Sequence, residues 1–446
     1  MVQRIFRVML SDKELQGLRQ KHLGPSLKLA YEKPIHIVRG EGQYLFDADG
    51  HQYLDCVNNV QHVGHCHPKV VAAARKQYGA LSTNTRYLDD TIVRYAKGLS
   101  ETLPDGLDVC FFTNSGSEAN DLALRLARNF TGSKETIVFA SAYHGHVSSL
   151  IEISPYKHSG PGGSGPPDFV HVVPAPDQFR GQFRGLGSSE QYVREFKQVV
   201  DQIKGARHQL SAFFVEAMMG CGGQIPVPEQ FLRSAFALAK NSGAVCIADE
   251  VQVGFGRVGS HYWAFEKCGV VPDIVTMGKS MGNGHPISAV VTTGEIADAF
   301  NNGMEYFNTF GGNPVSCSVG LAVLDVIRDE GLQDNAFEVG SHLLDQLTHL
   351  KSKHDLIGDV RGAGLFIGVE LVNDGVTLQP ATNEANVLVN IMKEKGFLLS
   401  SDGPDQNVIK IKPPMVFNEE NAEVLVNTID EVLPLVIQIS STVDYN

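Results

Sequence analysis

Continuously apolar stretches alternate with amphipathic stretches through the middle of the chain. The apolar stretches are short and end in polar residues, which predicts buried strands at 109–113, 136–140, 211–217, 244–250, 273–279 and 287–293. Between them, apolar positions recur at helical spacing and predict helices at 117–130 and 228–243. Apolar strands that alternate with helices indicate an α/β fold with a mostly parallel sheet covered on both faces.

The two ends of the chain follow a different pattern. Residues 35–57 alternate in short strand-like pieces around a polar turn. The pattern of the C-terminal part predicts helices at 314–328 and 339–353 and strands at 365–371 and 407–412. It also predicts two further helices near the end of the chain. A chain of 446 residues exceeds one ordinary hydrophobic core. We therefore expect a large domain at 75–325 and a smaller α/β domain formed by 1–74 and 326–446.

The formal net charge of −13 argues against nucleic acid or an anionic membrane as the main partner. The seven cysteines are scattered and odd in number, which is typical of free thiols in a reducing compartment. No apolar run approaches the length of a membrane span.

The opening run MVQRIFRVML carries arginines among apolar residues, as transit peptides do. Asp12 and Glu14 follow it, however, and transit peptides are poor in acids. We expect a soluble cytoplasmic protein, with the mitochondrial matrix as the alternative.

Asp249 and Lys279 each stand at the end of a predicted buried strand. Pyridoxal 5'-phosphate (PLP) chemistry needs such a pair, because the amine forms a Schiff base with the cofactor and the carboxylate keeps the pyridine nitrogen protonated. The simpler alternative is that Asp249 caps a turn and Lys279 is a solvated loop lysine. Further elements along the chain favour the PLP interpretation.

The motif NSGSEAN at 114–120 leads from a strand into a helix. Backbone N–H groups at a helix N-terminus bind anions, and here Gly116 permits close approach while Ser115 and Ser117 add hydroxyl groups. The alternative for this motif is a capping box made by Ser117 and Asn120.

Four further residues suit a planar phosphorylated cofactor. Tyr143 follows a predicted strand and can lie flat on a ring, although packing alone would also explain it. Side chains alternate within a strand, so Asp249 and Val251 share one face, which places Val251 against the ring, while Gln252 can reach the phenolic oxygen. Thr309, in a glycine-rich turn before a helix, can bind a phosphate.

A metal site is not expected. His62, His65, Cys66 and His67 crowd together in the sequence, but no second cluster completes a tetrahedral set. The glycines also do not follow a first strand in the pattern of a dinucleotide-binding fold.

The chain resembles the class III aminotransferases of PLP fold type I over almost its whole length. The motifs that carry this resemblance are GHCHP at 64–68, NSGSEAN, YHG, ADEVQVGFGR, MGKSMGNGHP, NTFGGNP and RGAGLFIGVEL. The resemblance implies a large domain with a mostly parallel, seven-stranded type of sheet flanked by helices. It also implies a homodimer, with a tetramer as the alternative.

The resemblance assigns roles to individual residues. Lys279 would form the Schiff base and Asp249 would hold the ring nitrogen. The other implied cofactor contacts are stacking by Tyr143 and Val251, polar contacts by Gln252, His144 and Glu216, and phosphate binding by Ser115, Gly116, Ser117 and, across the subunit interface, Thr309. We expect cationic surroundings to lower the pKa of Lys279.

Within the family, the chain looks most like the phospho-lyases that act on ethanolamine phosphate or 5-phosphohydroxylysine. Many transaminases fix a substrate carboxylate with an arginine before a Pro-Pro pair, where this chain has Lys410 and Lys412. A lysine is a flexible point charge where arginine would give a planar fork. The change argues against carboxylate recognition of the usual kind and suits a phosphate better. Expecting only one of the two lysines to point inward, we favour Lys410 and add Arg86 as a further candidate.

The resulting hypothesis is a phospho-lyase that eliminates phosphate from a phosphorylated amine and leaves aldehyde, ammonia and inorganic phosphate. The first alternative is a transaminase that moves an amino group from an amine or ω-amino acid to pyruvate or glyoxylate. A non-catalytic binding protein that retains the fold is the third possibility. The sequence does not distinguish which phosphorylated amine is preferred.

Overall fold

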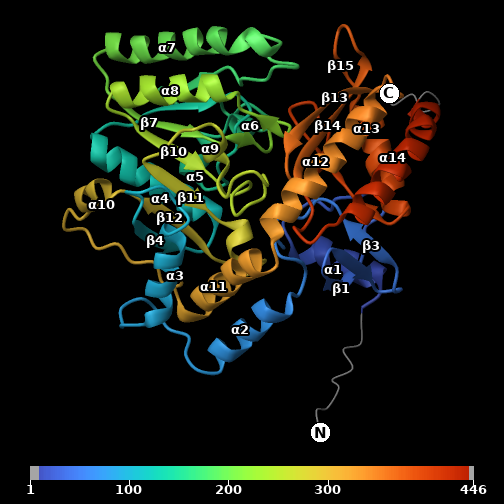
Figure 1. Ribbon diagram of the computed structural model, residues 1–446, viewed down its shortest axis with the longest axis horizontal. Coiled ribbons are helices and arrows are strands. Elements are labelled where there is room, and N and C mark those ends of the chain that lie inside the picture. Colours follow the sequence, from blue (N-terminus) through green and yellow to red (C-terminus); the bar gives the residue numbers. More distant parts are fainter. Residues whose placement is uncertain (1–9, 441–446) are drawn as a thin grey trace.

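The structure of the protein is a computed structural model that describes residues 10–440 (Figure 1). The run weighed above as a transit peptide lies outside these residues, apart from Leu10. Among the residues described, no helix is both long enough and apolar enough to cross a membrane.

A seven-stranded sheet forms the centre of the larger part of the molecule. Its strands, in spatial order, are β4 (Val109–Thr113), β12 (Ser288–Thr292), β11 (Ile274–Met277), β10 (Val245–Asp249), β7 (Leu210–Val215), β5 (Glu135–Phe139) and β6 (Val170–Val173). Only β12 runs antiparallel to its neighbours β4 and β11, and the other pairs are parallel. The predicted mostly parallel sheet is confirmed.

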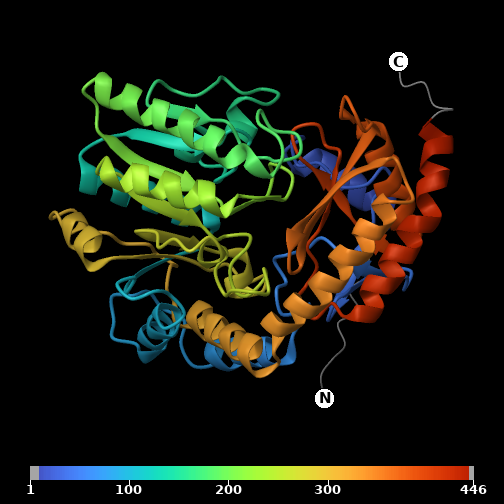
Figure 2. The same ribbon diagram turned by 45° about the horizontal axis from the view of Figure 1, so that its top comes forward.

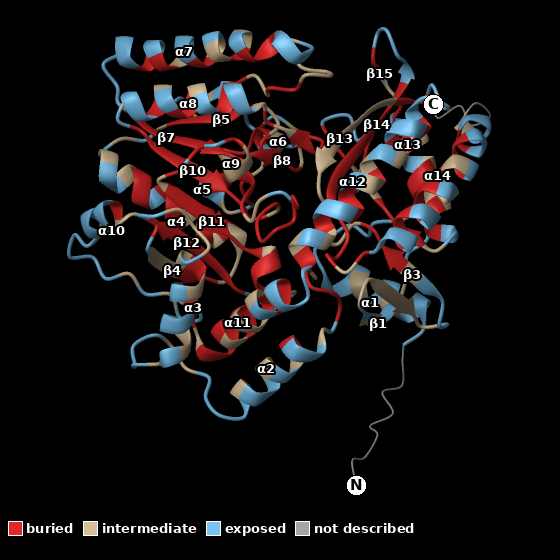
Figure 3. Ribbon diagram, viewed as in Figure 1, coloured by how far each residue is buried: buried red, intermediate tan, exposed pale blue. Residues whose placement is uncertain are grey.

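Helices cover both faces of this sheet, and the buried strands lie between them (Figure 3). Because successive strand residues point to opposite faces, Phe213 packs against Phe196 and Phe236 on one side, whereas Phe214 joins the core on the other side. The first side is covered by α7 (Ser189–Gly205) and α8 (Glu229–Asn241), and the second by α4 (Gly116–Thr131), α5 (Ser148–Ile151) and α10 (Gly294–Phe300).

Three helices pack together at the lower end of the larger part as Figure 1 shows it. There α11 (Pro314–Asp329) contacts both α2 (Pro68–Tyr78) and α3 (Asp90–Ser100). The chain then continues into α12 (Leu332–Lys351), which extends toward the second part of the molecule (Figure 2). Shorter elements of the larger part are α6 (Pro155–His158), β8 (Met218–Met219), β9 (Ile225–Pro226) and α9 (Ala264–Lys267).

The second part of the molecule combines both ends of the chain. One sheet has the order β1 (Ile37–Glu41), β2 (Tyr44–Asp47), β3 (Gln52–Asp55) and β16 (Phe397–Leu398), so N-terminal and C-terminal strands pair directly. The other sheet contains β13 (Ile357–Ala363), β14 (Phe366–Asp374), β18 (Val408–Ile411) and β17 (Ser400–Asp402), with β15 (Gln379–Pro380) beside β14. Its remaining helices are α1 (Asp12–His22), α13 (Thr382–Glu394) and α14 (Glu419–Ser440). The exact domain limits remain a prediction.

A buried arginine ties three distant segments together. Arg257 is fully buried and donates hydrogen bonds to the carbonyl oxygens of Leu365 and Pro413, at 3.0 and 2.8 Å, and to Nδ1 of His62 at 3.0 Å. His62 in turn donates from Nε2 to the Phe255 carbonyl at 2.8 Å. Arg257 thereby fixes the segment that begins immediately after Lys412.

Candidate functional site

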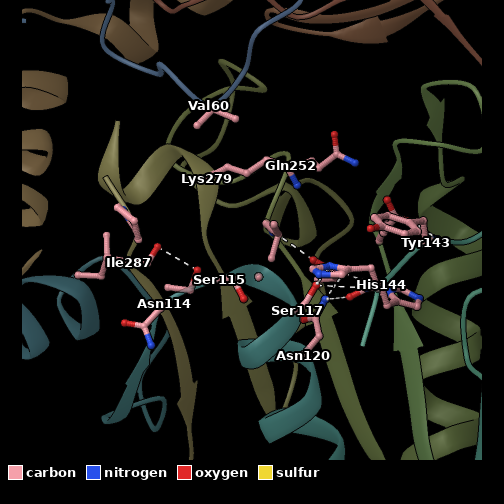
Figure 4. Close-up of a pocket in the computed structure, with 18 of the residues that line it drawn as sticks. Val60, Asn114, Ser115, Ser117, Asn120, Tyr143, His144, Gln252, Lys279 and Ile287 are labelled. Atoms are coloured by element: carbon pink, nitrogen blue, oxygen red, sulfur yellow. Dashed lines mark hydrogen bonds and ion pairs between the residues drawn. The ribbon is translucent and has the colours of Figure 1, made fainter. Parts of the chain in front are cut away.

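A cavity of about 400 Å³ lies where the central parallel strands end (Figure 4). Ligands of open α/β sheets bind at this edge, because the carboxyl ends of parallel strands and the following helix N-termini converge there. Ten residues predicted from the sequence line it: Ser115, Gly116, Ser117, Tyr143, His144, Glu216, Asp249, Val251, Gln252 and Lys279. Their roles toward a cofactor remain predictions, but the structure brings them to one place.

Lys279 follows β11 and points into the cavity (Figure 4). Its φ of 33° lies in the left-handed region, which is strained for a side-chain-bearing residue and is often found at functional sites. Burial lowers the pKa of the Lys279 amine, opposed by the nearby Asp249 carboxylate. Nearby Lys410 also lowers the pKa of Lys279, but less than burial does. The main cause of the lowered pKa is therefore desolvation and not the cationic surroundings that we expected. No hydrogen bond or ion pair engages this amine within residues 10–440.

Asp249 ends β10 and is held by three hydrogen bonds. Its Oδ2 accepts from Nδ2 of Asn120 at 2.8 Å and lies 2.9 Å from Nδ1 of His144, and its Oδ1 accepts from the backbone N–H of Val251 at 3.1 Å. A carboxylate can only accept, so His144 carries its proton on Nδ1. The carboxylate is thus fixed in orientation while it lines the cavity.

Asn120 is a functional candidate that the sequence analysis considered only as part of a capping box. The capping-box alternative is wrong, because Ser115 caps α4 by accepting from the Glu118 N–H at 3.2 Å. Asn120 instead orients Asp249 and also donates to the His144 carbonyl at 2.7 Å. Its signal was present in the sequence as a polar side chain on the helix face that also holds Ala123 and Leu124, both of them buried.

Val251 lines the cavity for a different reason from the one predicted. Strand β10 ends at Asp249, and Val251 lies in the following turn, so strand alternation does not place it. The hydrogen bond from its N–H to Asp249 folds the turn back. A Cβ at Gly116 would lie 2.8 Å from Val251 Cγ1, which explains why glycine is needed there.

The start of α4 offers the predicted anion cradle. The first-turn N–H groups of Gly116 and Ser117 border the cavity. Ser117 Oγ lies 3.0 Å from Nδ1 of His146, and a Cβ at Gly145 would approach that Oγ to 2.8 Å. Glycine at both positions therefore avoids close contacts that a Cβ would make with the residues around the cradle.

Glu216 acts on the backbone of its neighbours. It accepts from the N–H groups of Tyr143 at 3.2 Å and Gly220 at 2.9 Å. Burial raises the pKa of Glu216 to about 7, with a further contribution from Asp249. These bonds hold the backbone at Tyr143, whose side chain lines the cavity.

The expectation that only one of Lys410 and Lys412 points inward is wrong. Residues two apart in a strand share a face, and both amines approach Asp402 Oδ2, Lys410 at 3.1 Å and Lys412 at 4.0 Å. Lys412 is the more buried of the two and donates to Oε1 of Gln252 at 2.8 Å. Burial, aided by Lys410, lowers the pKa of Lys412 to about 8.

Thr309 and Arg86 do not line the cavity within one chain. Both are exposed, and Arg86 forms an ion pair with Glu305 at 3.1 Å and stacks 4.2 Å from the Phe307 ring centroid. The assignment of Thr309 to a partner's site and of Arg86 to the substrate phosphate remain predictions.

The four metal-like residues of the 62–67 segment have separate surroundings. His62 contacts Arg257, His65 pairs with Asp55 at 2.7 Å, and His67 lies 3.3 Å from Glu330. Cys66 is exposed. Each of the three histidines therefore has its own hydrogen-bond or ion-pair partner.

The cavity fits PLP in the chemistry of its side chains. It combines an amine of lowered pKa, a fixed carboxylate, an aromatic wall and a glycine-bordered helix N-terminus, each positioned as described above. The model of the class III aminotransferases matches residues 28–433. The chain belongs to this family, and it is a PLP-dependent enzyme.

Individual relatives cover almost the whole chain. A Drosophila melanogaster protein named alanine–glyoxylate aminotransferase 2-like is 51% identical over 96% of this chain and 88% of its own length. The Caenorhabditis elegans ethanolamine-phosphate phospho-lyase homolog 1 is 44% identical over 95% and 94%. A solved phospholyase from Arthrobacter in complex with phosphoethanolamine superposes with a TM-score of 0.89, at 37% identity over 94% and 99%.

Proposed function

We propose that this enzyme is a phospho-lyase that eliminates phosphate from a phosphorylated amine such as ethanolamine phosphate. The observation that carries the proposal is the pair of amines of Lys410 and Lys412, gathered on Asp402 next to the cavity residue Gln252. Two amines against one carboxylate leave a net positive charge that suits a phosphate group. The similarity to a phospho-lyase homolog and to a phosphoethanolamine-bound phospholyase supports the same substrate class.

The residues around the cavity divide the chemistry between them. Bound PLP supplies an electron sink for negative charge at the carbon that bears the substrate amine. Lys279 Nζ, with its lowered pKa, takes the proton from that carbon as general base, and Asp249 holds a proton at the pyridine nitrogen. The C–O bond to phosphate on the next carbon then breaks. Water releases ammonia and leaves acetaldehyde from ethanolamine phosphate.

A transaminase is the second candidate function. The name of the Drosophila melanogaster relative favours it, as does the human alanine–glyoxylate aminotransferase 2, which is 38% identical over 93% of this chain. Lys279 and Asp249 serve both reactions equally, so only the groups that contact the rest of the substrate distinguish them.

Replacing Lys410 with methionine tests the anion subsite. We expect KM for ethanolamine phosphate to rise by about tenfold or more, because a charge-assisted hydrogen bond contributes roughly 1.5–3 kcal/mol. We expect kcat to change less, since Lys279 and Asp249, which carry the proton transfers, are unchanged in this variant. Steady-state phosphate release measures both constants, with exposed Lys134→Met as the matched control. An unchanged KM in the Lys410 variant would remove the phosphate subsite from this position.

We further propose that the enzyme is a homodimer in which the partner supplies Thr309, with a tetramer as the alternative. The segments at 86–88 and 304–310 are joined by the contacts of Arg86, and they expose five large apolar side chains: Tyr87, Leu88, Met304, Phe307 and Phe310. Such a patch marks a contact surface. Leu88→Asp should produce monomers that retain PLP less tightly, as sedimentation velocity and dialysis can measure. A variant that stays dimeric would place the interface elsewhere.

The cellular compartment of the protein is a separate proposal. We propose the cytoplasm. The mitochondrial matrix is the alternative, since the names of the human and one Arabidopsis thaliana relative place those proteins in mitochondria. Immunolocalisation of the full chain with a compartment marker decides between the two.

A further inference from the structure

Gln252 connects the lysine pair to the cavity. Its side chain lines the cavity, while its Oε1 accepts from Nζ of Lys412 at 2.8 Å and from Nδ2 of Asn59 at 3.4 Å. Lys412 has little freedom to move away, because its side chain is only 5% exposed and its backbone N–H donates to the Cys56 carbonyl at 2.8 Å. The chain beyond it is held by Arg257 through Pro413.

This contact determines which end of the Gln252 amide faces Lys412. A lysine ammonium has hydrogens to donate and no lone pair to accept, so only the amide oxygen can face it. The NH2 group is therefore directed elsewhere and has no hydrogen-bond partner within residues 10–440. A Cβ at Gly220 would lie 2.4 Å from that nitrogen, so the glycine makes room for the amide in this orientation.

We propose that Lys412 is a positioning residue that holds the Gln252 NH2 group available to the phenolic oxygen of the cofactor, and so couples the anion subsite to the cofactor ring. This inference rests on the proposed function in one respect, namely that the anion bound beside Lys412 is the substrate phosphate. An anion beside Lys412 competes with Gln252 for the hydrogens of the ammonium and so weakens the bond to Gln252. The protonation of the bound cofactor would then depend on whether an anion occupies the subsite.

The surroundings of Lys412 define what else can influence it. The charged and titratable groups that face it are Asp402, Lys410, Lys279 and the thiol of Cys221, and the Phe366 ring lies 5.3 Å from its amine. Lys410 also influences Lys279 through space, so removal of either lysine removes a positive charge near the cavity. The effect that passes through Gln252 must therefore be separated from this general loss of charge.

A double-mutant cycle makes the separation. The visible absorbance band of the bound cofactor is titrated with pH, without substrate, in the wild-type holoenzyme and in Lys412→Met, Lys410→Met, Gln252→Met and the two doubles with Gln252→Met. Loss of a positive charge and of a donor to the phenolic oxygen favours the protonated form of the cofactor. Lys412→Met should raise the midpoint of the titration by about one pH unit.

In the Gln252→Met background, Lys412→Met should raise the midpoint by less than half of the amount by which it raises it in the wild-type background. Lys410→Met should shift the midpoint equally in both backgrounds. A midpoint that does not move in Lys412→Met, or shifts that add fully in both doubles, would overturn the proposal. Because no substrate is present, these outcomes do not depend on the reaction type.

Inorganic phosphate tests the link to the proposed function separately. Added to the wild-type holoenzyme, it should raise the midpoint, and it should raise it by less in Lys412→Met, where only its through-space charge remains. If the Lys412→Met substitution shifts the midpoint but phosphate does not shift it in the wild-type holoenzyme, the coupling through Gln252 stands and the phosphate subsite is contradicted.

Discussion

Replacing Lys279 with alanine is expected to lower turnover by about a thousandfold or more, because the variant loses both the amine that bonds to PLP and the general base. Reduction with hydride, which attaches the cofactor permanently to the wild-type chain, should attach none to the variant. The phosphate cradle at Gly116 and Ser117 is intact in the variant, so PLP should still bind without a covalent bond. Turnover assays and mass spectrometry of the reduced protein measure these effects.

Lys204→Ala is the matched control, since Lys204 is an exposed lysine on α7. It should keep both turnover and hydride attachment. Attachment of the cofactor to a different lysine in the Lys279 variant would show that the assignment of Lys279 is wrong.

Asp249→Asn is expected to reduce turnover by about three orders of magnitude or more while the fold and some PLP binding persist. A neutral amide cannot hold a proton at the pyridine nitrogen by charge, and it also disturbs the bonds from Asn120 and His144. Single-turnover kinetics and the cofactor absorbance report on chemistry and binding separately.

The neighbouring carboxylate provides the control for this variant. Glu250 is also buried, but it accepts from the N–H groups of Ala264 and Phe265 at the start of α9 and does not line the cavity. Glu250→Gln should affect the free energy of unfolding and keep most of the turnover. Near-normal rates in Asp249→Asn with a large loss in Glu250→Gln would reverse the assignment.

Much of the site could be predicted from the sequence because it depends on topology. Parallel strands end at one edge of a sheet, so residues that follow buried strands, such as Asp249 and Lys279, meet there. Gly116 and Ser117 were recognisable for a similar reason, since they open a helix directly after a strand. The mostly parallel sheet follows from the same apolar runs.

The errors arose where tertiary contacts override local periodicity. Val251 was placed by strand alternation, but the strand had already ended and a hydrogen bond to Asp249 positions it. The role of Asn120 depends on a partner that is 129 positions away in the sequence. The contact of Lys412 with Gln252 spans 160 positions, and no local pattern predicts it. Thr309 depends on a second chain, which one sequence does not place.

The most direct test of the proposed reaction is phosphate release from ethanolamine phosphate without any keto acid. Elimination returns the cofactor in its aldehyde form, so the holoenzyme should release phosphate, ammonia and acetaldehyde in equal amounts through many turnovers. A parallel reaction with alanine and glyoxylate measures the second candidate function. If no phosphate is released and amino transfer stops after one turnover until pyruvate or glyoxylate is supplied, the enzyme is a transaminase and the phospho-lyase account is wrong.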